Sequence, residues 1–125
     1  MRLVNLRRDP IKRIRPEGVE LESGERVRLL GIDTPEREEC YYSEAAEYLR
    51  GAVSGQVVRL ETDQTEVDEY GRLLRHVFLP AATSERHLNF ELVAEGYADT
   101  LYIPPDDAYR AEFVAAREAA ERAAL

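Results

Sequence analysis

The sequence has little cysteine or histidine and no tryptophan, and these shortages exclude several classes of protein. One cysteine among 125 residues leaves no partner for an internal disulfide. With only two histidines beside it, the chain lacks the ligands for a cysteine-rich zinc module or a histidine-based copper centre. No apolar run approaches the roughly 18 residues of a membrane-spanning helix, so we expect no membrane partner.

The first residues do not have the pattern of a signal peptide, so we expect none in this sequence. The first residues contain several arginines and lack the apolar stretch of roughly 7–15 residues that such a peptide requires. We therefore expect a cytoplasmic protein or the mature form of a secreted one. A length of 125 residues, 44% of them hydrophobic and 34% charged, predicts one folded domain over residues 1–125, which we expect to be a monomer.

Lysine is nearly absent, and acids outnumber bases. Lys12 is the single lysine among 17 basic residues, and the formal net charge is −8. The first 15 residues run against this trend, with six basic groups and one acid. Because phosphate binding depends on positive surface, an acidic molecule attracts nucleic acid weakly. Any action on nucleic acid must therefore depend on a local site.

The hydrophobic pattern changes from strands to helices along the chain. Alternation predicts strands over residues 3–15, 19–21, 27–32, 57–60 and 73–79, the first a bulged edge strand because it contains Pro10. Helical spacing follows over residues 43–53 and 88–95, and again after Asp106, which is expected to cap the last helix. This order is typical of an α+β fold, a five-stranded Greek-key OB-fold barrel with about three helices.

One strand end combines an arginine with two carboxylates. Residues 28–36 read Arg-Leu-Leu-Gly-Ile-Asp-Thr-Pro-Glu, so an apolar strand ends at Asp33 and a rigid turn leads to Glu36. Alternation places Arg28 on one face with Leu30 and Ile32. Carboxylates bind calcium or magnesium, and a guanidinium binds phosphate oxygens in pairs. The segment indicates either a metal-and-phosphate site or a turn in which Arg28 only neutralises a neighbouring acid.

A second motif, Asp-Glu-Tyr-Gly-Arg at residues 68–72, precedes the last expected strand. Together the two motifs resemble the staphylococcal nuclease family, in which the Arg-Leu-x-Gly-x-Asp-Thr-Pro-Glu strand end and the Asp-x-Tyr-Gly-Arg turn face each other across the active site. The resemblance covers residues 14–102 and has both motifs in the right order. It implies a calcium-dependent phosphodiesterase that hydrolyses DNA and RNA with low sequence selectivity and leaves 3′-phosphate ends.

The resemblance assigns roles to individual residues. It makes Arg28 and Arg72 the arginines that contact the phosphate. It makes Glu36 the general base, or the group that orients the attacking water. Asp33 becomes a calcium ligand through its carboxylate, and Thr34 becomes one through its backbone carbonyl.

One turn departs from the family pattern. The family's Asp-Gly-Asp-Thr turn, which supplies a second aspartate ligand, is replaced by Arg-Pro-Glu-Gly at residues 15–18. Glu17 then lies at the ligand position, on one face with Val19 and Leu21, but is one methylene longer. Calcium, with six to eight flexible oxygen ligands, tolerates a displacement of about 1.5 Å better than magnesium does. The alternatives are a solvated acid at Glu17 and, for the chain, a non-catalytic nuclease-like OB-fold module that binds nucleic acid or protein.

The remaining polar candidates have simpler interpretations. Tyr102 matches a family tyrosine that contacts the substrate, but it also fits a half-buried tyrosine at the barrel rim. The acids of residues 61–69 are expected to form a solvated face, except that Asp68 is expected to brace the turn that presents Arg72. His76 is expected to be a packing residue.

Overall fold

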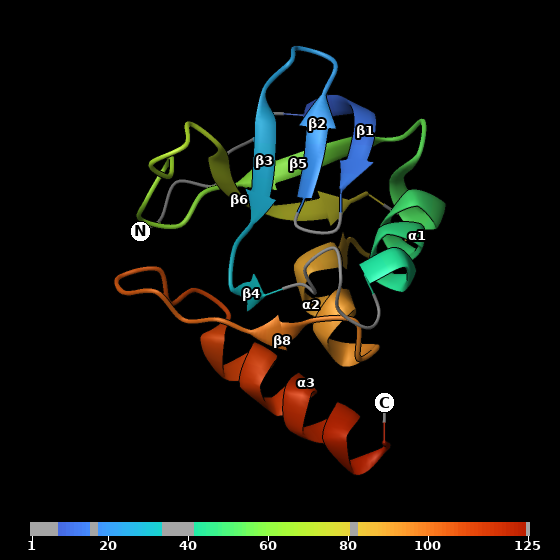
Figure 1. The fold of residues 1–125 in the computed structure, drawn as a ribbon, viewed down its shortest axis with the longest axis vertical. Coiled ribbons are helices and arrows are strands. Elements are labelled where there is room, and N and C mark those ends of the chain that lie inside the picture. The colour runs from blue at the N-terminus through green and yellow to red at the C-terminus, as the bar shows by residue number, and fades with distance from the viewer. Residues whose placement is uncertain (1–7, 16–17, 34–41, 81–82, 125) are drawn as a thin grey trace.

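The computed structural model describes residues 8–15, 18–33, 42–80 and 83–124. Five strands form a closed barrel (Figure 1): β1 (Arg8–Arg15), β2 (Gly18–Leu21), β3 (Arg26–Leu29), β5 (Val57–Glu61) and β6 (Leu73–Leu79). Antiparallel pairs give the order β3-β2-β1-β5-β6, and a parallel pairing of β3 with β6 closes the ring. The predicted α+β class and five-stranded OB-fold barrel are confirmed.

Three helices and three short strands complete the described part of the chain. The helices are α1 (Tyr42–Val53), α2 (Leu88–Ala94) and α3 (Arg110–Arg122), as the sequence predicts. Strand β7 (Arg86–His87) extends the sheet beside β6, and β4 (Ile32–Asp33) pairs with β8 (Asp99–Thr100). Figure 1 shows the β4–β8 pair between the barrel and α3. None of the described helices has the length and apolar character needed to cross a membrane.

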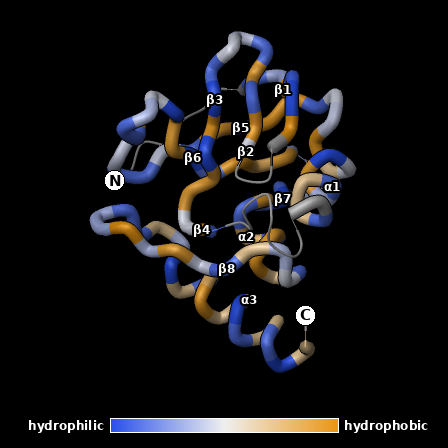
Figure 2. Tube along the Cα trace, in the orientation of Figure 1, coloured by the Kyte–Doolittle hydropathy of each residue, from blue (hydrophilic) through white to orange (hydrophobic). Residues whose placement is uncertain are grey.

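The core lies inside the barrel and continues beneath the helices. Figure 2 shows hydrophobic residues gathered along the barrel strands, while the turn that joins β2 to β3 is hydrophilic. The fully buried residues come from strands and helices alike, and they include Leu21, Leu60, Leu49, Leu92 and Phe113. Because Phe113 belongs to α3, the last helix is part of the core.

The prediction that the first strand lies at a sheet edge is wrong. β1 pairs with β2 on one side and with β5 on the other, because closure of the barrel leaves it between two neighbours. The expected bulge is present as a register shift between Ile11 and Arg13. Pro10 pairs with Val57, the first residue of β5, where a missing N–H interrupts the ladder least.

The strand predicted over residues 27–32 is broken at Gly31. β3 ends at Leu29, and Gly31 has a φ of +80°, which turns the chain before β4 begins. Leu30 remains on the side of Arg28, as expected, but Ile32 enters the core, so its predicted place beside Arg28 is wrong. A Cβ on Gly31 would lie 2.4 Å from Cε2 of Phe113, so only glycine allows the chain to pass this close to α3.

Candidate active site

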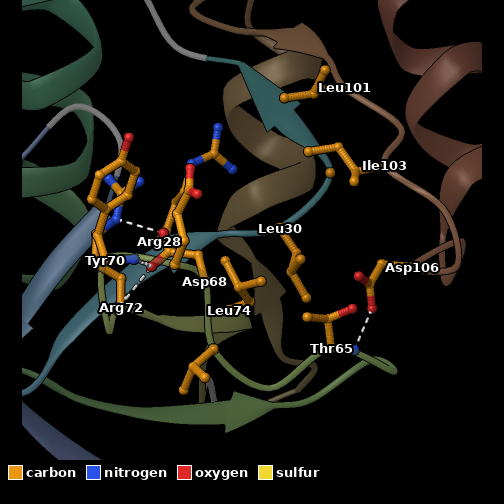
Figure 3. Close-up of a pocket in the computed structure, with 13 residues that line it drawn as sticks. Arg28, Leu30, Thr65, Asp68, Tyr70, Arg72, Leu74, Leu101, Ile103 and Asp106 are labelled. Atoms are coloured by element: carbon orange, nitrogen blue, oxygen red, sulfur yellow. Dashed lines mark hydrogen bonds and ion pairs between the residues drawn. The ribbon is translucent and has the colours of Figure 1, made fainter.

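A cavity of about 370 Å³ lies where the end of β3 meets the segments 65–74 and 101–106 (Figure 3). Its wall includes Leu30, Leu74 and Leu101, and two arginines, Arg28 and Arg72, line it as well. An apolar wall excludes water, which strengthens the attraction between a guanidinium and a bound anion. Asp68, Glu69 and Asp106 also line the cavity, but Asp68 already accepts a hydrogen bond from Arg72 and Asp106 accepts two from backbone N–H groups. The arginines and the apolar wall together suit a ligand that has an apolar face and a negative charge.

Asp68 holds the turn that presents Arg72. Its Oδ1 accepts hydrogen bonds of 2.9 Å from the backbone N–H groups of Tyr70 and Arg72, and its Oδ2 accepts one of 2.7 Å from Nε of Arg72. Burial raises the pKa of Asp68, but the hydrogen bonds from Arg72 and Tyr70 outweigh burial and hold it below the usual value. The predicted brace is confirmed.

Arg28 lies half-buried where β3 leads into β4. Its Nη1 donates to the carbonyl of Leu29 at 3.4 Å, and its Nη2 donates to the carbonyl of Ile32 at 3.5 Å. Asp33, which follows Ile32, is exposed at the end of β4 and does not line the cavity. The structure thus brings Arg28 and Arg72 to one cavity and places Asp33 at the adjoining strand end.

The other predicted site residues divide into two groups. Thr34, Glu36 and Glu17 lie outside the residues that the structure describes. Tyr102 is 37% exposed and lines a neighbouring hollow of about 100 Å³ rather than the cavity of the two arginines. There its ring lies beneath the guanidinium of Arg110, whose Cζ is 3.7 Å from the ring centroid.

Glu61 was expected on a solvated face, and this interpretation is wrong. Its carboxylate is buried, accepting hydrogen bonds from the Tyr109 hydroxyl at 2.6 Å and from Arg59 at 3.2 Å. Arg59 in turn donates two hydrogen bonds to Glu85, at 2.7 and 2.8 Å. A buried carboxylate with such donors fastens the start of α3 to the barrel.

Asp106 does not cap the last helix. Tyr109 occupies the cap position, with a left-handed φ of 64°. The Oδ1 of Asp106 instead accepts a hydrogen bond of 2.8 Å from the backbone N–H of Gln64. It accepts a second, of 2.7 Å, from the backbone N–H of Thr65 (Figure 3). In the reverse direction, Asp63 accepts one from the backbone N–H of Ala108 at 2.8 Å. These contacts join the two loops that border the cavity.

Sequence reasoning placed Leu30 beside Arg28 but missed Leu74 and Leu101, the other parts of the apolar wall, and it missed Arg110. Leu74 and Leu101 meet only because distant segments converge, which no local pattern indicates. For Arg110 a signal was available, because a basic residue at the start of a helix opposes the helix dipole and requires another explanation.

Comparison with known proteins decides the family. Residues 26–125 match the family model described as "Staphylococcal nuclease homologue". The chain belongs to the staphylococcal nuclease family. It is 36% identical over 107 residues to the thermonuclease of Staphylococcus intermedius, covering 81% of this chain and 61% of that protein. It is 31% identical over 102 residues to the thermonuclease of Staphylococcus hyicus, covering 77% of this chain and 58% of that protein.

The staphylococcal nuclease match confirms the family predicted from the two motifs. Both motifs lie within the matched region, which begins at Arg26, the first residue of β3. The altered turn with Glu17 precedes that region. The chain spans about three fifths of the length of both thermonucleases, at 61% and 58%.

Proposed function

We propose that this chain is a calcium-dependent phosphodiesterase that hydrolyses DNA and RNA with low sequence selectivity and leaves 3′-phosphate ends. The observation that carries the proposal is the convergence of Arg28 and Arg72 on one apolar-walled cavity in a nuclease-family fold. A cavity that offers guanidinium groups and an apolar wall selects the phosphate and the face of a base rather than base edges, which agrees with low selectivity.

The two arginines have a direct role in this chemistry. Hydrolysis of a phosphodiester builds negative charge on the non-bridging and leaving oxygens in the transition state. Guanidiniums held in place before the reaction stabilise that charge without reorganisation. Asp68 fixes one of them by its 2.7 Å bond to Nε of Arg72, which leaves the terminal nitrogens to bind phosphate. Glu36 acts, in the family pattern, as general base or orients the attacking water.

The donors assigned to the metal suit calcium. The Asp33 carboxylate, the Thr34 carbonyl and the Glu17 carboxylate are all oxygen ligands, which this cation prefers. Among the described residues, none donates a hydrogen bond to the carboxylate of Asp33, and no group of three acidic, histidine or cysteine side chains is placed to hold a metal ion. Thr34 and Glu17 would complete the site beside Asp33. When bound, calcium supplies positive charge next to the phosphate.

The test is cleavage of single-stranded DNA and RNA with millimolar calcium, repeated with EGTA. We expect calcium-dependent cutting and products whose 3′ ends carry phosphate, detected by their failure to serve as primers until a phosphatase is added. No cutting by folded protein would contradict the proposal. Cutting that persists in EGTA would contradict its calcium requirement.

The alternative is a non-catalytic module that binds nucleic acid or protein. The Arg-Pro-Glu-Gly turn at residues 15–18 and the net charge of −8 favour it, because the first alters a ligand and the second weakens attraction for polyanions. The effect of calcium on the melting temperature distinguishes the enzyme from the non-catalytic module. A ligand that binds only the folded state raises the melting temperature, so an enzyme should be stabilised by calcium and a degenerate module should not.

A further inference from the structure

A second arginine–tyrosine pair lies beside the cavity of Arg28 and Arg72. The guanidinium of Arg110 stacks on Tyr102, with Cζ 3.7 Å from the ring centroid, and both residues are exposed. Among the described residues, no carboxylate forms an ion pair with Arg110. Stacking uses the face of the guanidinium and leaves its N–H groups at the edge, where they can bind an anion. The guanidinium of Arg110 is thus held in one orientation, and its N–H groups are free to bind an anion.

Helix stability does not explain why an arginine stands at this position. Arg110 is the first residue of α3, where the positive end of the helix dipole disfavours a cation and favours an acid. The start of the helix is nevertheless firmly placed by the bond from the hydroxyl of Tyr109, the preceding residue, to buried Glu61. The fold therefore holds a cation where local energetics oppose one.

The Arg110–Tyr102 hollow adjoins the cavity of the two arginines. Both are lined by Gly31, Leu101 and Asp106, and exposed Ile103, the residue after Tyr102, lines the cavity of the two arginines. On the opposite border of the cavity, Arg72 lies 5.5 Å from the ring centroid of Tyr70, which is 67% exposed. An arginine–tyrosine pair therefore flanks the cavity on each side.

We propose that Arg110 and Tyr102 form a second subsite for single-stranded nucleic acid, which binds the strand beyond the nucleotide held in the cavity. Arg110 binds a backbone phosphate through its N–H edge, and Tyr102 holds the guanidinium in place by stacking against its face. This inference rests on the proposed function, because it requires a nucleic-acid strand in the cavity of Arg28 and Arg72. The subsite makes affinity depend on strand length.

Binding of a fluorescent oligothymidylate, measured by anisotropy in EGTA, tests the proposal without cleavage. We expect Arg110→Glu and Arg110→Ala to raise Kd about five- to tenfold and Arg110→Lys to raise it less, because lysine keeps the charge but loses the planar stacking. Removing one phosphate contact should also flatten the plot of log Kd against log salt by about 0.7. The matched control is Arg122→Glu, the same charge change at the other end of α3.

Three further readouts separate the possible failures. Arg110→Glu places an acid at the start of the helix, so its melting temperature should not fall, and weaker binding cannot be assigned to unfolding. The kcat/KM for a thymidine dinucleotide, which occupies the cavity alone, should stay within about twofold of the unmodified protein. Equal Kd values for Arg110→Glu and Arg122→Glu would overturn the subsite alone. Failure of the unmodified protein to bind the oligothymidylate or cleave the dinucleotide would overturn the proposed function and the subsite together.

Discussion

At the scale of single residues, the presentation of Arg72 depends on a neighbour four positions away. One carboxylate, that of Asp68, accepts two backbone N–H bonds and one from Nε of Arg72. The same group therefore shapes the turn and orients the guanidinium. The carboxylate can do both because each of its oxygens accepts hydrogen bonds, and the bonds from Arg72 and Tyr70 hold the pKa of Asp68 below its usual value.

Replacing Asp68 by asparagine should uncouple shape from orientation. The amide oxygen can still accept backbone bonds, but its NH₂ group cannot accept the bond from Nε of Arg72. We expect kcat/KM on single-stranded DNA to fall about tenfold or more, with a loss of about 1–2 kcal/mol in the free energy of unfolding. Glu66→Gln, a change at an exposed acid of the same loop, is the control. Equal rates for the two variants would show that the brace has no role.

Gly31 offers a second test at this scale, because the cost of a steric clash with Phe113 can be separated from the cost of a left-handed backbone conformation. Gly31→Ala introduces a Cβ 2.4 Å from Phe113 at a φ of +80°, whereas Gly55→Ala has a similar φ, +73°, and nothing within 4 Å of the new atom. In urea denaturation, Gly31→Ala should cost about 1–3 kcal/mol more than Gly55→Ala. Equal costs would mean that α3 does not pack against Gly31 as described.

At the scale of elements, a buried polar cluster fastens α3 to the barrel. Nδ1 of His76 lies 3.1 Å from Nε2 of His87, and both rings contact Tyr109 edge-on. Burial and the neighbouring His76 lower the pKa of His87 to about 3. The hydrogen bond between the two rings requires one donor and one acceptor, so it is lost when both nitrogens carry protons.

This cluster predicts that acid weakens the fold. The folded pKa of His87, about 3, is below the unfolded value of 6.5. The contribution of neutral His87 to the free energy of unfolding is therefore fully present above about pH 6.5. This contribution declines by up to about 1.4 kcal/mol per pH unit as the pH falls toward 3. Measured by urea denaturation between pH 7 and pH 4.5, the free energy of unfolding should decline less steeply for His87→Gln than for the unmodified protein. If the free energy of unfolding depended on pH in the same way in both proteins, His87 would not be a buried neutral histidine.

The same elements show where sequence reasoning succeeds and fails. The last helix was predicted because helical spacing is a local property, and Phe113 and Ala116, three residues apart, are both buried in α3. Likewise the motif containing Asp68 carries its own brace. The partners of Glu61 and Asp106 were not predictable, because each bonds to residues more than 40 positions away. An acid in a loop has the same local pattern whether it is solvated or buried.

At the scale of the whole molecule, 25 acidic residues outnumber 17 basic ones, which gives a net charge of −8. Attraction of nucleic acid must come from contacts at the site rather than from the overall field. If Arg28, Arg72 and Arg110 make the phosphate contacts, the slope of log K against log salt for single-stranded DNA should be about −2. A fluorescence titration at several salt concentrations measures this. A slope of about −5 or steeper would show a larger basic surface than the account allows.

The proposed phosphodiesterase activity depends above all on the two arginines that meet at one cavity. The most direct measurement is the initial rate of calcium-dependent cleavage of single-stranded DNA by the unmodified protein and by Arg72→Ala, with exposed Arg50→Ala on α1 as the control. We expect cleavage by the unmodified protein and by the control, and a rate at least about 100-fold lower for Arg72→Ala. Undiminished cleavage by folded Arg72→Ala, or none by the unmodified protein, would contradict it.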